Sequence, residues 1–256
     1  MIYKITHTDC AAKLFDGWEE TLIWSCLQGV MGAVYGDDPV HPNSAAAVIG
    51  DFTFFAGAPL RELAEFSPAS CKTDFRILVP DGDEWKALLM KTYGPQARLI
   101  WRYALKKEPD VFDISSLTRA VSQLSPAYVL RLIDKALYEQ CKSESWSSDL
   151  VSQFPTWESF KALGLGVVIL KDGIIVSGAS SYGRYLSGIE IEVDTREDFR
   201  RKGLAYLCSA RLILECQKRG LYPSWDAHNM ESVALAEKLG YHFSHPYEAI
   251  EVTASV

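Results

Sequence analysis

Apolar positions along the chain alternate between helical spacing and short strand-like runs. In the first half, four apolar residues recur at steps of three or four and predict an amphipathic helix over Leu14–Met31: Phe15, Trp18, Leu22 and Cys26. The other patterns predict a hairpin of strands 45–49 and 52–56 around Gly50-Asp51, a short helix at 59–66, a strand at 75–79, a helix at 83–93 and a strand at 98–105. This order indicates a mixed α/β domain.

The second half continues the mixture. Its patterns predict a strand at 128–133, a helix capped by Asp134 and running to Cys141, a shorter helix at 156–162, strands at 166–170, 174–180 and 188–194, a helix from Gly203 to Lys218, a strand at 224–227, a helix at 229–239 and a strand pair at 241–243 and 247–252. Charge, proline and serine interrupt the apolar pattern between Lys106 and Ser125. We therefore expect an N-terminal α/β domain over 1–120 and a second domain over 121–256, in the α/β (α+β) class.

Composition and charge indicate which kinds of partner, cellular location and metal site to expect. The 256 residues are 48% hydrophobic, which is typical of a globular protein, and the net charge of −7 opposes binding to nucleic acid. Six cysteines without paired spacing indicate reduced thiols and a cytoplasmic protein. The N-terminus lacks a leader pattern and Asp51 breaks the longest apolar stretch, so we expect no secretion and no membrane partner. His228, His242 and His245 lack a zinc-binding framework, so we expect no metal.

One segment carries candidate chemistry. A predicted strand from Ile189 to Val193 leads into a basic turn, and Gly203 then opens a long helix. Such a turn directs successive backbone N–H groups and the positive end of the helix dipole toward one point, which suits a pyrophosphate. Three basic residues before a helix also occur in ordinary solvated turns, so these residues alone leave both interpretations open.

The motif Arg200-x-x-Gly203-x-Ala205 resembles the Arg/Gln-x-x-Gly-x-Gly/Ala acyl-CoA signature of the GNAT acyltransferase superfamily, and it lies between the expected strand and helix. Two further runs resemble the superfamily's next helix and its closing residues: Asn229-x-x-Ser232 and Leu239-Gly240-Tyr241. The resemblance covers about half of the chain, from Tyr128 to Val252. It implies a GNAT-type mixed sheet flanked by helices.

A closer resemblance concerns one branch of the superfamily. The segments Ile189–Ala205 and Trp225–Tyr241 are similar to the branch that contains zwittermicin A resistance acetyltransferase. The N-terminal half has no basic glycine turn before Asp113. It is either a degenerate copy of the same fold or an unrelated α/β cap, and we expect it to wall the acceptor pocket, with the loop Tyr35–Pro42 as a candidate contact for a cationic amine.

The resemblance implies that acetyl-CoA is the co-substrate. Its pyrophosphate would lie on the basic turn and the start of the helix, and its pantetheine amides on the preceding strand end. The implied binding residues are Val193, Asp194, Thr195, Arg200, Arg201, Lys202, Gly203, Leu204, Ala205, Asn229 and Ser232. Asn229 is also an ordinary helix N-cap, and that role explains it without a ligand.

Acetyl transfer to an amine requires a base for the ammonium group. Glu190 and Glu192 lie on one face of the predicted strand because side chains alternate along it, and we expect Glu190 to be the base, with Glu192 as the alternative. A partly exposed strand whose glutamates only meet solvent is the competing interpretation. For the acid, many superfamily members have a tyrosine where this chain has Ala236. The substitutes are Ser232, Tyr241, Tyr182 and solvent.

These predictions favour an acetyl-CoA-dependent N-acetyltransferase that acetylates a primary amine of a small molecule by direct attack in a ternary complex. The alternatives are a non-catalytic acyl-CoA sensor or scaffold and an acetyltransferase that acts on protein amines. The sequence leaves open whether the chain is a monomer or a homodimer.

Overall fold

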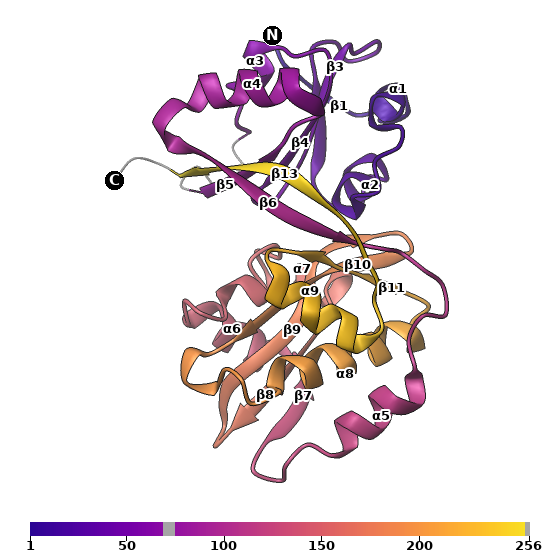
Figure 1. Ribbon diagram of the computed structural model, residues 1–256, viewed down its shortest axis with the longest axis vertical. Helices are drawn as coiled ribbons and strands as arrows, with labels where there is room; N and C mark the ends of the chain where they lie inside the picture. The colour runs from indigo at the N-terminus through magenta and orange to yellow at the C-terminus, as the bar shows by residue number, and fades with distance from the viewer. Residues whose placement is uncertain (69–74, 254–256) are drawn as a thin grey trace. The chain divides into compact units, whose positions relative to one another are not determined.

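Two compact units divide the chain, Met1–Arg102 with Pro246–Val256 and Tyr103–His245. The computed structural model describes residues 1–68 and 75–253 (Figure 1). The first unit's main segment ends at Arg102, whereas the sequence places the domain boundary at residue 120, and that boundary stays a prediction. Among the described cysteines, five are free thiols, and Cys71 lies outside the described residues.

The first unit is built on a largely antiparallel sheet. Its strand order is β1-β2-β3-β4-β5-β13-β6, where β4 and β5 pair in parallel. The strands are β1 (Tyr3–Ile5), β2 (Ala33–Gly36), β3 (Ser44–Ile49), β4 (Phe52–Gly57), β5 (Phe75–Val79), β6 (Ala97–Leu105) and β13 (Phe243–Thr253). The helices are α1 (Asp9–Ala12), α2 (Thr21–Leu27), α3 (Arg61–Ala64) and α4 (Gly82–Tyr93).

Neighbouring residues of β4 show that this sheet is covered on both faces. Phe54 meets Trp18, which precedes α2, with ring centroids 6.2 Å apart, while Phe55 meets Trp85 of α4 at 4.9 Å. Successive side chains of a strand point to opposite faces, so α1 and α2 lie on one side and α3 and α4 on the other (Figure 1). Trp85 is fully buried and donates its indole N–H to Gly57 O at 2.8 Å.

The second unit has a sheet of order β7-β8-β9-β10-β11, in which β10 and β11 pair in parallel. Its strands are β7 (Val129–Leu132), β8 (Gly166–Lys171), β9 (Ile174–Tyr185), β10 (Gly188–Thr195), β11 (Tyr222–Ser224) and the short β12 (Asp226–Ala227). Its helices are α5 (Ile114–Ser122), α6 (Lys135–Ser143), α7 (Trp157–Leu163), α8 (Leu204–Lys218) and α9 (Met230–Leu239). Ile189, Ile191 and the apolar side of α8 share one core.

The two units repeat one order of elements. In each, two helices follow the first strand, four strands form an antiparallel run, a crossover leads to a fifth strand parallel to the fourth, and a helix follows. The crossover helix has 15 residues in α8 but four in α3. The repeated order favours the degenerate copy over an unrelated cap as the origin of the N-terminal half.

Most of the predicted elements are present, three predictions were wrong, and one helix was not predicted. The helix expected over Leu14–Met31 is divided, because Asp16 leaves the helical region (ψ 130°) and Gly17 has φ +87°. The final strand pair is one continuous strand, β13. The strand expected at 224–227 is split between β11 and β12, which pair in different sheets. The helix that the patterns missed is α5, in the polar stretch between Lys106 and Ser125, and Asp113 caps its N-terminus.

Three basic side chains surround the carboxyl group of Glu215 on α8. Glu215 accepts hydrogen bonds from Arg211 at 2.9 Å and Arg219 at 2.5 Å, and also from Lys218 at 3.0 Å. Burial opposes ionisation of this carboxyl group, but the three cations together lower the pKa of Glu215 to about 2.

Among the described helices, none is long and apolar enough to cross a membrane.

Candidate functional site

The candidate site begins where two parallel strands separate. β10 and β11 pair at three positions only, from Gly188 with Tyr222 to Glu190 with Ser224. β10 then continues to Thr195, while the chain after β11 enters β12, which pairs with β6 instead. Over residues 191–195, one edge of β10 therefore has no neighbouring strand in the described part of the chain. An open strand edge can bind an extended ligand through its amides.

One amide of this edge is held by a neighbouring side chain. The backbone N–H of Val193 donates to Glu192 Oε1 at 3.1 Å. Among the carbonyls that follow, Thr195 O is engaged by Arg200 Nε at 3.3 Å, whereas Asp194 O faces the paired strand β9 and accepts from Ser177 Oγ at 3.3 Å. A ligand amide that used the Val193 N–H would have to displace the Glu192 carboxylate.

The start of α8 presents a row of backbone donors. Arg201 and Gly203 have φ of +59° and +76°, and this left-handed conformation turns successive N–H groups toward one side. Leu207 is the first residue of the helix to bond back, to Gly203 O at 3.2 Å, and the described residues offer no acceptor to the N–H groups of residues 201–206. A Cβ atom on Gly203 would meet open space. The arrangement fits a pyrophosphate, which needs many donors and room beside the backbone.

The basic side chains of the turn are exposed and partly fixed. Lys202 lies over the ring of Phe199 at 4.4 Å and donates to Asp198 O at 2.9 Å. Arg196 lies over the same ring at 4.7 Å. Arg200 and Arg201 are exposed as well. Together these side chains give the turn a local positive charge in an acidic protein, as an anion site requires.

Three carboxyl groups alternate along β10, on the face away from the α8 core. They belong to Glu190, Glu192 and Asp194. The pairing with β9 shifts by one residue between Glu190 and Ile191, and the extra residue is Tyr182 on β9, so the alternation along β10 is kept. Glu190 is 7% exposed and lies at the point where β10 and β11 separate. The solvent-facing interpretation does not describe Glu190, whereas Glu192 is half-buried.

The family model for GNAT acetyltransferases matches residues 12–250. The chain belongs to the GNAT acetyltransferase family. A solved GCN5-related N-acetyltransferase-like protein from Streptococcus suis is 48% identical, with a TM-score of 0.90 over 96% of this chain and 98% of that one. An uncharacterized N-acetyltransferase of Bacillus subtilis is 28% identical over 93% of this chain and 92% of its own length.

A tandem GNAT protein from the clavulanic acid biosynthesis pathway shares the fold. It is 11% identical, with a TM-score of 0.57 over 100% of this chain and 99% of that one. The likeness supports a GNAT fold built from two parts, in agreement with the repeated order of elements. The family match also extends over nearly the whole chain, whereas the resemblance seen in the sequence began at Tyr128.

Asp194 was expected to bind the pantetheine through its backbone, but its side chain also has an unusual environment. Burial and the nearby charge of Asp149 raise the pKa of Asp194 to about 7, although Arg200 acts in the opposite direction. Asp149 lies in a short 3-10 helix, Ser148–Leu150, which packs against β9 through Leu150 O, the acceptor of the Ser180 hydroxyl at 2.5 Å. No local pattern places Asp149 beside Asp194, because 45 residues separate them.

Glu190 lies within electrostatic range of three tyrosines. Burial is the main reason that the pKa values of Tyr185, Tyr222 and Tyr241 are raised, and the charge of Glu190 adds to it. Tyr185 Oη is 2.8 Å from the hydroxyl of Ser224, the residue that pairs with Glu190. A deprotonated tyrosine is therefore disfavoured around this carboxylate.

The general-acid candidates lie in different surroundings. Ala236 is fully buried in the core of the second unit. Tyr241 is 1% exposed and donates its hydroxyl to Pro223 O at 2.6 Å, which identifies it as a core residue. The Ser232 hydroxyl accepts from the Trp225 indole at 3.0 Å, while Asn229 caps α9 by accepting from Ser232 N at 2.9 Å. Tyr182 is buried on β9.

The loop expected to contact a cationic amine and the possible metal ligands complete the description of the site. In the loop Tyr35–Pro42, Asp37 accepts from the backbone of Asn43 and Ser44, and Asp38 from that of Val40 and His41, so both carboxylates hold their own loop. Within residues 1–68 and 75–253, no group of three or more side chains is placed to hold a metal ion.

Proposed function

We propose that the chain is an acetyl-CoA-dependent N-acetyltransferase that acetylates a primary amine of a small molecule by direct attack in a ternary complex. One observation carries the proposal. The open edge of β10 leads directly into the donor row at the start of α8, so an extended pantetheine and its pyrophosphate have adjoining places. The GNAT family match gives this arrangement its chemical meaning.

Acetyl-CoA would be bound more by backbone N–H and C=O groups than by side chains. The edge of Val193, Asp194 and Thr195 would pair with the pantetheine amides, after Glu192 releases the Val193 N–H. The N–H groups of residues 201–205 would hold the pyrophosphate, with Arg200, Arg201 and Lys202 supplying positive charge. Asn229 and Ser232 would contact the pantetheine arm only if their present contacts, the helix cap and the Trp225 indole, leave a lone pair or donor available.

Glu190 would accept the proton of the attacking ammonium group. The free amine then attacks the thioester carbon and a C–N bond forms. As the C–S bond breaks, the sulfur leaves as a thiolate, the nitrogen loses its second proton to water, and Glu190 releases its proton to solvent before the next turnover. Among the candidates for the acid, Tyr241 is the least suited, because its hydroxyl is buried and bonded to Pro223 O. We therefore favour protonation of the thiolate by solvent, with Ser232 and Tyr182 as the remaining side-chain candidates.

The acidic face of β10 bears on the acceptor. The carboxyl groups of Glu190 and Glu192 favour a cationic amine of the polyamine or aminoglycoside kind. The proposal also includes three expectations from the sequence: a likeness to the zwittermicin A resistance branch, a cytoplasmic location, and a division into domains over 1–120 and 121–256. An acyl-CoA sensor and a protein acetyltransferase are the alternatives, and Ala236 in place of the usual tyrosine is the observation that favours the sensor.

One experiment tests the proposal in two steps. Acetyl-CoA and CoA should both raise the melting temperature, whereas adenosine, which lacks the pyrophosphate and pantetheine, should raise it far less. Release of free thiol from acetyl-CoA is then followed against a panel of diamines, polyamines, aminoglycosides and a lysine-rich peptide. Turnover with a small amine supports the proposal. Binding without turnover would indicate the sensor, turnover with the peptide alone would indicate the protein acetyltransferase, and absence of binding would refute all three.

A further inference from the structure

Two hydroxyl groups of the second unit lie on the same face of the sheet as Glu190. Tyr185 of β9 and Ser224 of β11 are both buried, and their hydroxyl oxygens are 2.8 Å apart. Ser224 pairs with Glu190 in the parallel ladder. Tyr185 pairs with Gly188, which precedes Glu190 by two residues on β10. Paired residues of neighbouring strands place their side chains on one face, so the two hydroxyl groups and the carboxyl group are neighbours.

The phenol of Tyr185 crosses one strand to reach Ser224. β9 and β11 are not adjacent, because β10 lies between them. A Cβ atom on Gly188 of β10 would collide with Tyr185 Oη, so the phenol passes over the strand where a side chain is missing. The hydroxyl pair thus depends on three strands and on one glycine.

The charge of Glu190 sets the direction of the hydrogen bond in this pair. Burial raises the pKa of Tyr185, and the charge of Glu190 raises it further, so the phenol keeps its proton. An ionised carboxylate orients nearby O–H dipoles with their hydrogens toward it. Tyr185 then donates to Ser224 Oγ, and the hydrogen of the Ser224 hydroxyl points toward the carboxylate.

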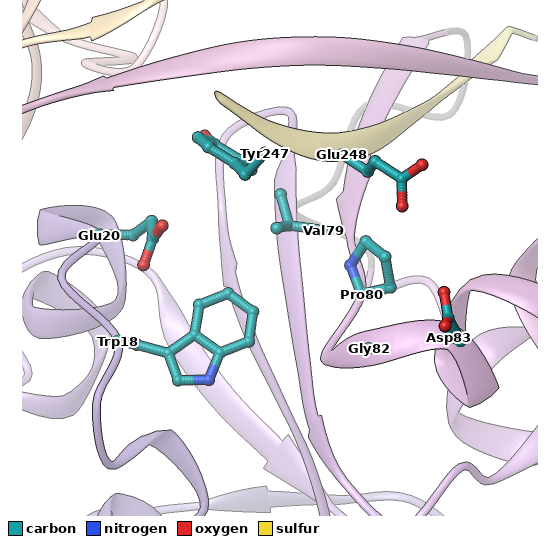
Figure 2. Close-up of a pocket in the computed structure, with 8 residues that line it drawn as sticks. All are labelled: Trp18, Glu20, Val79, Pro80, Gly82, Asp83, Tyr247 and Glu248. Carbon is teal, nitrogen blue, oxygen red and sulfur yellow. The ribbon is translucent and has the colours of Figure 1, made fainter. Parts of the chain in front are cut away.

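The first unit offers an internal comparison, because it repeats the order of elements. Its parallel ladder of β4 and β5 also has three pairs and ends at Phe54 with Val79. The ladder of the second unit ends at Glu190 with Ser224. Phe54 packs against Trp18, and Val79 lines a cavity of about 200 Å³ that Trp18 also lines (Figure 2). Where the carboxyl group is replaced by a phenyl ring, the hydroxyl group opposite it is replaced by an isopropyl group.

The other two positions of the arrangement differ in the same sense. Tyr185 pairs with Gly188 at the closed end of the second ladder. At the corresponding place in the first unit, Ile49 pairs with Phe52. The phenol and the glycine that it crosses are therefore both replaced by apolar side chains in the unit without the carboxyl group. This joint replacement is expected if the hydroxyl pair serves the carboxyl group.

With Glu190 as the base, an assignment that rests on the proposed function, we propose that Tyr185 and Ser224 are its positioning residues. The Ser224 hydroxyl, held by Tyr185, donates to the Glu190 carboxylate and fixes its orientation at the point where β10 and β11 separate. A donor to the charged form of a carboxyl group favours that form. The pair therefore keeps a buried base ready to accept a proton from the ammonium group.

Other titratable and charged side chains border this carboxyl group. They come from β10 itself, β9, β11, α8, the 3-10 helix at 148–150 and the residue that follows Gly240: Glu192, Asp194, Arg184, Tyr222, Cys216, Asp149 and Tyr241. All of them are kept in the variants described next. A difference in the titration of the carboxyl group between parent and variant therefore reports on the hydroxyl pair.

The first measurement needs no turnover. The side-chain carboxyl carbon of Glu190 is followed by NMR against pH in the full chain, and its resonance is assigned by its loss in Glu190→Gln. Ser224→Ala should move the midpoint about 1 to 2 pH units higher, because the carboxylate loses one charge-assisted hydrogen bond. Tyr185→Phe should move it in the same direction by less. Ser224→Thr keeps the hydroxyl group and should restore the midpoint of the parent.

The second measurement uses acetyl transfer. In Ser224→Ala, kcat should fall about 2- to 10-fold at pH 6 and recover at pH 9, with little change in KM for acetyl-CoA. Because the pair acts through Glu190, Ser224→Ala should have no further effect in the Glu190→Gln background. A purely structural role would instead lower kcat at every pH and in both backgrounds.

Two matched controls remove similar groups elsewhere in the second unit. Ser180→Ala deletes a buried serine hydroxyl that donates to Leu150 O, and Tyr138→Phe deletes a buried phenol hydroxyl that donates to Phe154 O. Both should leave the titration of Glu190 unchanged. An unmoved midpoint in Ser224→Ala, an equal movement in Ser180→Ala, or multiplied losses in the double variant would overturn the inference. A moved midpoint in a chain that shows no turnover would uphold the hydroxyl pair and refute the proposed function instead.

Discussion

Glu190 of β10 and Ser224 of β11 form the last pair of a three-residue parallel ladder, and the two strands separate immediately beyond them. Glu190, which is 7% exposed, therefore lies at the inner end of the open strand edge. This is where the reactive end of an extended acyl-CoA would lie if its pyrophosphate binds at the start of α8.

Glu190→Gln tests the base. The substitution keeps the shape and removes the proton acceptor, so kcat should fall by roughly 10²- to 10⁴-fold near neutral pH, with little change in the Kd of acetyl-CoA. Steady-state kinetics and calorimetry check the two quantities. Glu197→Gln, an exposed residue of the turn, is the control and should behave as the parent protein. If Glu192→Gln shows the large loss and Glu190→Gln does not, the roles of the two glutamates are reversed.

Glu192→Ala tests the edge of β10. The Glu192 carboxylate accepts from the Val193 N–H at 3.1 Å, and acetyl-CoA would have to displace it. Removing this competitor should lower the Kd of acetyl-CoA by about 2- to 10-fold, the equivalent of one hydrogen bond. Glu192→Gln, which keeps an acceptor oxygen and loses the charge, separates the hydrogen bond from electrostatics. An unchanged Kd in Glu192→Ala would show that the ligand does not use this amide.

Gly203→Glu tests the donor row. A glutamate at this position brings bulk and negative charge to the place proposed for the pyrophosphate, and calorimetry should show no binding of acetyl-CoA. Part of the effect could come from strain, because Gly203 has φ +76°. Gly220→Glu is a matched control, since that glycine has φ +64° and a Cβ there also meets open space. Equal losses in both variants would point to strain, and full binding in Gly203→Glu would remove the site assignment.

Asp194→Asn tests the raised pKa. In the folded state the pKa of Asp194 is about 7, well above its unfolded value, so the folded protein holds a proton that the unfolded chain has released. Stability from this group is complete below about pH 4 and is lost as the pH rises toward 7. The asparagine variant should therefore gain about 2–3 kcal/mol relative to the parent between pH 5 and pH 8 in urea unfolding.

The control for this titration is Asp172→Asn, in the exposed turn between β8 and β9. Its free energy of unfolding should run parallel to that of the parent over the same pH range. Asp149→Asn removes the second cause of the shift and should reduce the pH dependence in part. Parallel curves for Asp194→Asn and the parent would show that Asp194 ionises normally.

Ala236→Tyr tests whether the usual GNAT tyrosine can be restored. Ala236 is fully buried in a packed core, so the larger side chain should destabilise the fold by about 1–3 kcal/mol without adding a descending limb to the pH–rate profile. Ala234→Tyr places the same residue on the exposed side of α9 and should cost much less. A faster enzyme with a new descending limb in Ala236→Tyr would mean that the site has room for an acid after all.

Interactions between residues close together in the sequence determined many of the secondary-structure elements and the glycine turn. The hairpin of β3 and β4, the Asp134 cap of α6, the bounds of β5 and α8 and the glycine that opens α8 all depend on neighbouring residues, and the sequence alone predicted them. The alternation that places Glu190 and Glu192 on one face of β10 is also local, because a strand repeats every two residues. The glycine motif was enough to indicate the family.

Tertiary structure decided the rest. The separation of β10 from β11 depends on β12 pairing with β6, more than 100 residues away, and the shifted pKa of Asp194 depends on Asp149. The division of the helix expected over Leu14–Met31 follows from packing, since Trp18 meets Phe54 on the sheet instead of extending the α2 stripe. Burial and long-range pairing set these features, and both arise only when distant segments share one core.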